Sequence, residues 1–135
     1  MPEYPSAVAD THALLLHAGA SPKLGKRAAA HFAMCEQRQA LLYVPAVVVW
    51  EISLLARAGR FNLRRSLGQF FADLFSNPAY QEYALTSAQV IDAEGLRFNR
   101  DPFDALIVVA ARTLNMPLLS RDAEIGASGA VRVIW

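Results

Sequence analysis

The segment from Arg100 to Arg112 constrains the fold of this chain more than any other. It reads Arg-Asp-Pro-Phe-Asp-Ala-Leu-Ile-Val-Val-Ala-Ala-Arg, so two aspartates, Asp101 and Asp104, precede a run of apolar residues. The spacing predicts a helix with Asp101 at its N-cap and almost no face for water. Such a helix has to be covered by other elements on nearly every side.

Short apolar stretches alternate with helical segments along the whole chain. We expect strands at residues 5–9, 41–44, 83–85, 117–120 and 131–134. We expect the other helices at residues 13–17, 22–37, 45–56, 63–75 and 87–95. This alternation predicts a parallel sheet covered on both faces. The predicted fold class is therefore α/β, with one domain over residues 1–135 and a sheet of four to five strands.

Composition sets limits on the class of protein. The chain has 135 residues, 54% hydrophobic and 19% charged, which is typical of one domain with a substantial core. No apolar run approaches the roughly 20 residues of a membrane span, and no secretory signal is apparent. Cys35 is the only cysteine, so we expect no intrachain disulfide, no cysteine metal site and a reducing, cytoplasmic location.

The charge balance limits any nucleic-acid contact to a local patch. The net charge is +1, so the chain as a whole does not attract polyanions. Seven arginines are candidates for contacts with phosphates: Arg57, Arg60, Arg64, Arg65, Arg97, Arg100 and Arg121. For each of them, a solvated surface arginine is the alternative interpretation.

Five carboxylates from four segments are expected at one edge of the sheet. Asp10 directly follows the first strand, Asp122 follows the fourth, and Glu51 lies in the helix after the second. Asp101 and Asp104 open the apolar helix. Open parallel sheets bind ligands beyond the carboxyl ends of their strands, where these acids converge. Neighbouring carboxylates repel one another, and a bound cation removes that repulsion.

Glu51 is the most informative single acid. Its neighbours one helical turn away, Val47, Val48, Leu54 and Leu55, are all apolar, so no local ion pair can balance its charge. A buried charge without a partner is strongly destabilising, which favours a metal ligand. The alternative is a glutamate that reaches solvent at the domain edge or lies in a partner interface.

The aspartates have simpler alternatives. Asp101 can be only a helix cap, whereas Asp104 lies one turn inside the buried helix and is the stronger ligand candidate. Asp122 can be only an acid in the first turn of a helix. Asp10 needs a partner because it ends a buried strand. His12 has no second histidine to complete a metal motif, so we interpret it as structural or as a support to the site.

The ligand set predicts both the metal and the chemistry. Carboxylates without cysteine, and with one marginal histidine, favour Mg²⁺ or Mn²⁺ over Zn²⁺. A cation of this kind activates water and stabilises charge on a phosphoryl group. Phosphodiester hydrolysis is therefore the expected reaction.

Four segments together resemble the successive motifs of PIN-domain ribonucleases, and most closely those of VapC-type toxins from bacterial type II toxin–antitoxin modules. The segments are residues 9–15 (Ala-Asp-Thr-His-Ala-Leu-Leu), 49–52 (Val-Trp-Glu-Ile), 100–104 (Arg-Asp-Pro-Phe-Asp) and 117–122 (Pro-Leu-Leu-Ser-Arg-Asp). The resemblance covers essentially the whole chain in order. It departs from the family at Ala105, where a basic residue is common, so RNA contacts are not carried over.

The resemblance implies a Mg²⁺-dependent endoribonuclease that is inhibited by a cognate antitoxin, forms a homodimer and leaves a 5′-phosphate on the cleaved RNA. It implies that Asp10, Glu51 and Asp104 form the acidic triad, with Asp122 as a fourth acid, and that these four are the catalytic metal ligands. Three accessory residues are implied as well: Asp101, and the hydroxyls of Thr11 and Ser120.

Two other classes of function fit the sequence less well than a ribonuclease does. A PIN-like module that binds RNA or a protein without turnover would not need to retain five acids. Haloacid-type phosphatases need Asp-x-Asp after the first strand, where this chain has Asp10-Thr11-His12. A receiver domain needs an acid pair and a strand-end lysine that the sequence lacks.

Overall fold

The strands form one parallel sheet. The computed structural model describes residues 4–96 and 99–135. Within these ranges the sheet has five strands in the order β3-β2-β1-β4-β5, and every neighbouring pair is parallel. The strands are β1 (Ser6–Ala9), β2 (Leu41–Pro45), β3 (Tyr80–Tyr83), β4 (Leu118–Leu119) and β5 (Val133–Ile134). The predicted α/β class is confirmed.

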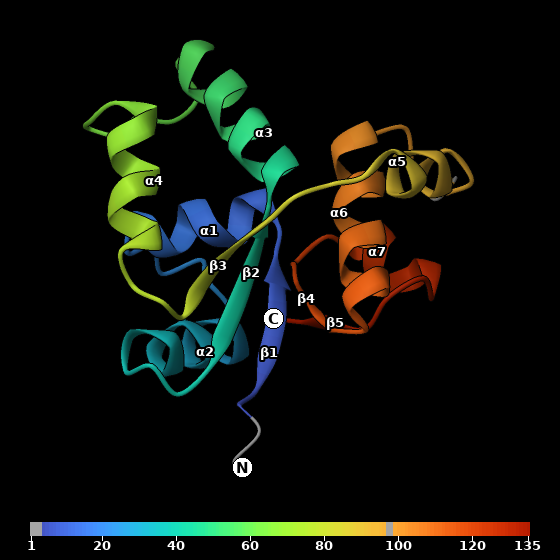
Figure 1. Ribbon diagram of the computed structural model, residues 1–135. Coiled ribbons are helices and arrows are strands. Elements are labelled where there is room, and N and C mark those ends of the chain that lie inside the picture. Colours follow the sequence, from blue (N-terminus) through green and yellow to red (C-terminus); the bar gives the residue numbers. More distant parts are fainter. Residues whose placement is uncertain (1–3, 97–98) are drawn as a thin grey trace.

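Helices cover both sides of the sheet. Figure 1 shows α1, α2 and α4 to the left of the strands, α5, α6 and α7 to the right, and α3 rising from the end of β2. The helices are α1 (Thr11–Ala18), α2 (Lys26–Glu36), α3 (Ala46–Arg57), α4 (Leu67–Phe75), α5 (Ser87–Glu94), α6 (Pro102–Leu114) and α7 (Ala123–Ser128). Among the described residues, no helix has the length and apolarity that crossing a membrane requires.

Helix α6 is buried as its sequence predicts. Its five central residues are all buried, and the helix contacts α3, α5 and β1. Asp101 is its N-cap and Asn115, in the left-handed conformation, its C-cap. The helix is therefore a fixed support for the two aspartates at its N-terminal end.

The register of β1 and β4 brings distant parts of the chain together. Ala9 pairs with Leu119, and the backbone N–H of Asp10 donates a hydrogen bond to the Leu119 carbonyl at 3.2 Å. The chain passes from β1 to β2 on one side of β1, and after β3 it crosses to β4 on the other side. Parallel sheets of this type bind ligands at such a switch point.

The predicted helix at residues 22–37 begins four residues late. Helix α2 starts at Lys26, with Gly25 as its N-cap. The C-terminal residue Trp135 packs directly against Gly25, and its carbonyl accepts a hydrogen bond from Arg27 N–H at 3.1 Å. The docked C-terminus therefore decides where the helix begins, not the Ser-Pro pair at residues 21–22.

Two other predicted boundaries are wrong. Helix α4 begins at Leu67, because Ser66 caps it by accepting a hydrogen bond from Gln69 N–H, while Asn62 instead closes a turn with Arg64 N–H. The third strand is Tyr80–Tyr83 and not residues 83–85. It pairs with β2 over Leu42–Pro45 and lies at an edge of the sheet, so part of it is polar and exposed.

We predict that Gly25→Ala destabilises the protein. A Cβ atom at residue 25 would lie 2.5 Å from the carbonyl carbon of Trp135, which is closer than packed atoms approach. The expected loss in free energy of unfolding is about 1–3 kcal/mol, measured by urea denaturation.

Gly68→Ala is the matched control. A Cβ atom there meets nothing within 4 Å, and the residue lies inside α4, so alanine should stabilise the protein by up to about 1 kcal/mol. Equal effects of the two substitutions would contradict the docking of Trp135 on Gly25.

Candidate metal centre

All five predicted acids line one cavity. It has a volume of about 400 Å³ and lies at the C-terminal edge of the sheet. Its lining comprises Asp10, His12, Glu51, Asp101, Asp104, Arg121, Asp122, Ala123 and Glu124. Four of the acids lie at strand ends or helix starts, and Glu51 lies in the second turn of α3, which is the convergence expected from the sequence.

Three of the acids are also helix caps. Asp10, Asp101 and Asp122 are the N-caps of α1, α6 and α7. In each case Oδ1 accepts the backbone N–H bonds of the first turn, at 2.8–3.4 Å. Within the described ranges, Oδ2 of Asp101 and of Asp122 accepts no hydrogen bond. One oxygen therefore caps the helix and the other is free for a ligand, so the cap and ligand interpretations are compatible.

Asp10 is the most buried of the acids, with 7% of its surface exposed. Burial raises the pKa of this carboxyl, and the Ser120 hydroxyl, the Ala13 N–H and the charge of His12 oppose that rise. Ser120 is itself held in place, because its Oγ accepts a hydrogen bond from Asp122 N–H at 3.1 Å. A single buried hydroxyl thus connects the acids that follow β1 and β4.

Glu51 is oriented by a hydroxyl from another helix. The Oγ1 of Thr11, a buried residue at the start of α1, donates to Glu51 Oε1. Burial raises the pKa of Glu51, the Thr11 bond lowers it, and the charges of Asp101 and Asp10 raise it further. The hydrogen-bond partner of Glu51 is therefore a neutral hydroxyl from another helix. This hydroxyl does not balance the negative charge of the carboxylate.

Asn99 holds the two aspartates at the start of α6. Its Nδ2 donates to Asp104 Oδ2 at 2.9 Å, and its Oδ1 accepts from Asp101 N–H at 2.9 Å. Burial raises the pKa of Asp104 to about 7 despite the Asn99 bond, and the charges of Asp101, Asp122 and Glu51 contribute to that rise. Three neighbouring acids are therefore close enough to disfavour the ionised form of Asp104.

The donor set fits a hard divalent cation. Among the described residues, none of the five acids forms an ion pair with lysine or arginine, and the two ion pairs found lie elsewhere. No three side chains in the described ranges are already arranged around one point as metal ligands. The cavity gathers oxygen donors and negative charge, and Arg121, the arginine in its lining, forms no ion pair with these acids in the described ranges; such a donor set suits Mg²⁺ or Mn²⁺ better than Zn²⁺.

Two residues at the site were not predicted from the sequence. Glu124, in the first turn of α7, lines the cavity, and Asn99, which lies outside the lining, donates a hydrogen bond to Asp104. Of the candidate arginines, Arg121 lines the cavity, and Arg65 is paired with Asp73 at 3.3 Å. Arg97 lies outside the described residues.

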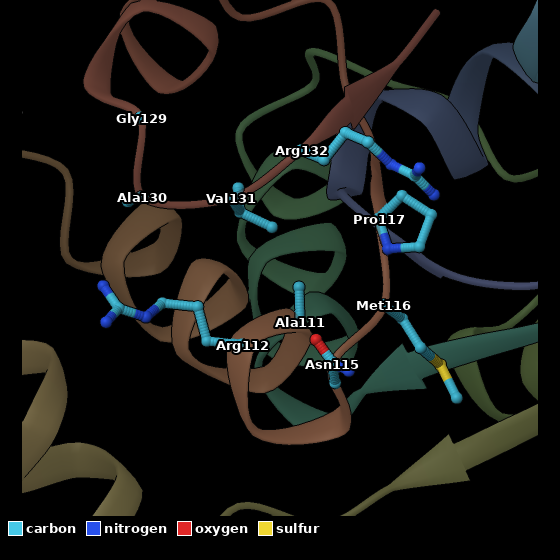
Figure 2. A pocket seen from close by; sticks show the side chains of 9 residues that line it. All are labelled: Ala111, Arg112, Asn115, Met116, Pro117, Gly129, Ala130, Val131 and Arg132. Carbon is cyan, nitrogen blue, oxygen red and sulfur yellow. The ribbon is translucent and has the colours of Figure 1, made fainter.

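A larger cavity lies at the opposite end of α6. Its volume is about 730 Å³, and its lining comes from the end of α6, the start of β4 and the segment before β5. Figure 2 shows Arg112 and Arg132 on opposite sides of it, with their guanidinium groups pointing apart. Among the described residues, no carboxylate, histidine or cysteine lines this pocket, so the chemistry favours the smaller, acidic cavity.

Solved structures share the fold over nearly the whole chain. A chain of VapBC2 from Rickettsia felis has a TM-score of 0.67 at 10% identity, with 96% of this chain and 97% of that chain covered. A chain of DNA-bound VapBC from Salmonella typhimurium has a TM-score of 0.65 at 11% identity, with 98% of each covered. A toxin–antitoxin complex from Klebsiella pneumoniae gives 0.62 at 13%, with 96% of each covered.

Sequence comparison gives the family. A search of curated proteins found no match. The PIN domain family model matches residues 7–128, which include all five acids of the cavity. PIN domains are generally nucleases and typically use divalent metals. The chain belongs to the PIN domain family.

Proposed function

We propose that this PIN-domain protein is an endoribonuclease that depends on Mg²⁺ or Mn²⁺. The observation that carries the proposal is the cavity lined by the five predicted carboxylates and Glu124, with no lysine or arginine paired to them in the described chain. Such a concentration of negative charge is costly to the folded state, and a bound divalent cation offsets that cost. Family membership supports a nuclease as the kind of enzyme.

The side chains divide into ligands and residues that hold them. Asp10, Glu51, Asp104 and Asp122 would bind the cation, with Asp101 as an accessory acid. Hydroxyl groups fix two of these ligands from outside the cavity: Thr11 donates to Glu51, and Ser120 bonds to Asp10. Partners of this type are worth about 10–100-fold in metal affinity or activity.

The proposed reaction is hydrolysis of an RNA phosphodiester. A divalent cation bound at this cavity supplies a water of lowered pKa and neutralises charge on the phosphoryl group. Arg121 lines the same cavity and is the one arginine there among the described residues, so its guanidinium can hold a phosphate oxygen. The acids themselves repel a bare phosphate, which makes substrate binding dependent on the metal.

We also propose that the protein is the toxin of a toxin–antitoxin pair, forms a homodimer and is inhibited by a small cognate protein. The structural neighbours from Rickettsia felis, Salmonella typhimurium and Klebsiella pneumoniae are described as VapBC or toxin–antitoxin complexes. Their shared fold over at least 96% of this chain supports the proposal. An antitoxin-like reading frame directly upstream of the gene would add support.

Asp10→Asn is predicted to abolish metal-dependent RNA cleavage. The substitution keeps the cap on α1 but removes the charge of the most buried acid. We expect wild type to cleave single-stranded RNA with Mg²⁺ or Mn²⁺ and not with EDTA, and Asp10→Asn to be at least about 100-fold slower. Gel analysis of end-labelled RNA measures both.

Asp92→Asn is the control, because Asp92 is exposed on α5 and lies outside the acidic cavity. Cleavage that survives both chelation and Asp10→Asn would contradict the proposal, whereas RNA binding without any cleavage would indicate a binding module. In cells, wild type should arrest growth and Asp10→Asn should not, with relief by the protein encoded upstream.

Asp104→Asn is predicted to stabilise the metal-free protein at alkaline pH. The pKa of Asp104 rises from its usual 3.8 to about 7 on folding, so the folded state binds this proton more tightly than the unfolded chain does. Its contribution therefore destabilises the fold as the pH rises from about 4 to about 7. In EDTA at pH 8, Asp104→Asn should melt about 2–4 °C above wild type, with little gain at pH 5.

Bound metal should reverse the order of the melting temperatures of wild type and Asp104→Asn. Millimolar Mg²⁺ should raise the melting temperature of wild type at pH 8 and affect Asp104→Asn much less, because a ligand is missing. The melting temperature of Asp92→Asn should match that of wild type under every condition. A wild-type melting temperature that ignores both Mg²⁺ and Mn²⁺ would contradict a cation site.

A further inference from the structure

The outer face of α3 carries an uncovered tryptophan beside the acidic cavity. Trp50 is 56% exposed and immediately precedes Glu51, which lines the cavity. Helical spacing puts Ala46 and Ser53 on the same face as Trp50, one turn to either side. Because these neighbours are small, neither can cover the indole ring. Trp50 is therefore an aromatic ring open to solvent, one residue from a candidate catalytic acid.

Arg57 adds a positive charge to this surface. Its guanidinium carbon lies 5.9 Å from the centroid of the Trp50 ring, two turns along the same helix. In the described part of the chain it forms no ion pair, so the indole ring is the contact that the structure gives it. The surface therefore combines an aromatic face with a cation that has no acidic partner.

The Trp50 surface and the acidic cavity are arranged so that the base and the phosphate of one nucleotide could each contact one of them. Glu51 and Trp50 are adjacent residues of one helix, so their side chains leave the axis about 100° apart. Glu51 turns toward Thr11 and the cavity, whereas Trp50, which is not among the residues that line the cavity, is exposed on an adjoining face of α3. A phosphate at the cavity would therefore have its attached nucleoside within reach of the indole.

Resting on the proposed function, we propose that Trp50 and Arg57 form a platform for single-stranded RNA. An unpaired base stacks on the indole of Trp50, its neighbouring phosphate lies at the acidic cavity, and Arg57 contacts a flanking phosphate. Single-strand-binding proteins combine stacking rings with backbone cations in this way, because every base has an aromatic face. Duplex RNA is excluded from the platform, since its bases are already stacked.

Charge favours RNA over a protein partner at this surface. The other exposed apolar pair on a helix, Val90 and Ile91 of α5, is followed by the exposed acids Asp92 and Glu94. Carboxylates beside an apolar patch repel phosphates. The Trp50 surface has Arg57 instead, and the acids nearest to it along the chain begin with Glu51, a residue of the cavity whose charge a bound cation would offset.

Fluorescence anisotropy with a labelled 12-nucleotide oligouridylate tests the platform. Binding is measured in the Asp10→Asn protein, so that the RNA stays intact, and Trp50→Ala is expected to weaken it about ten-fold or more. Trp50→Phe should keep most of the affinity because the phenyl ring still stacks. Ile91→Ala is the matched control: it removes a side chain that is 72% exposed and should change nothing.

Salt dependence separates stacking from phosphate contact. Arg57→Gln should reduce the slope of log affinity against log salt by about one, and Trp50→Ala should leave that slope unchanged. The chain has two tryptophans, so Trp135→Phe leaves Trp50 as the only one. Oligouridylate should quench its emission, and a hairpin duplex of the same length should quench it much less.

Two results would overturn the platform. One is an RNA affinity of Trp50→Ala that equals the affinity with Trp50 in place. The other is a change from dimer to monomer in light scattering with unchanged RNA affinity per protomer, which would make Trp50 part of a protein interface. The proposed function fails separately: stacking on Trp50 without any metal-dependent cleavage would leave the platform intact and remove the nuclease.

Discussion

The mutual repulsion of five carboxylates is the constraint on which the rest of this structure depends. They line one cavity of about 400 Å³, and no lysine or arginine among the described residues is paired with them. Burial raises the pKa values of Asp10, Glu51 and Asp104, and the charges of neighbouring acids raise them further. A fold retains such a cost at a place where a cation is expected to offset it.

Backbone geometry holds the acids against that repulsion. Three of them accept the first N–H groups of helices α1, α6 and α7, and the positive ends of these helices face the cavity. Each cap uses one carboxylate oxygen, so capping and metal binding do not compete. Buried α6 and the β1–β4 register then fix the spacing between caps, which loops alone could not do.

Local sequence signals predicted much of this arrangement. The capping box of Thr86 and Gln89 and the N-cap at Asp101 each depend on residues within one helical turn, and both occur in the structure. The helical neighbours of Glu51 likewise showed that none of them could form an ion pair with it. Boundaries set by distant contacts could not be predicted from the sequence. Helix α2 starts at Lys26 because Trp135 packs on its N-cap, Gly25, and β3 ends where β2 does. Asn99 supports Asp104 through a turn that no periodicity describes.

A metal centre at this cavity can be measured by titration with Mn²⁺, followed by the electron paramagnetic resonance signal of the free ion. Wild-type protein at pH 8 should remove the free-ion signal up to one or two ions per chain. Binding should be weaker at pH 6, where Asp104 holds its proton more often. A free Mn²⁺ signal that the protein leaves unchanged at either pH would contradict a metal centre built from these five acids.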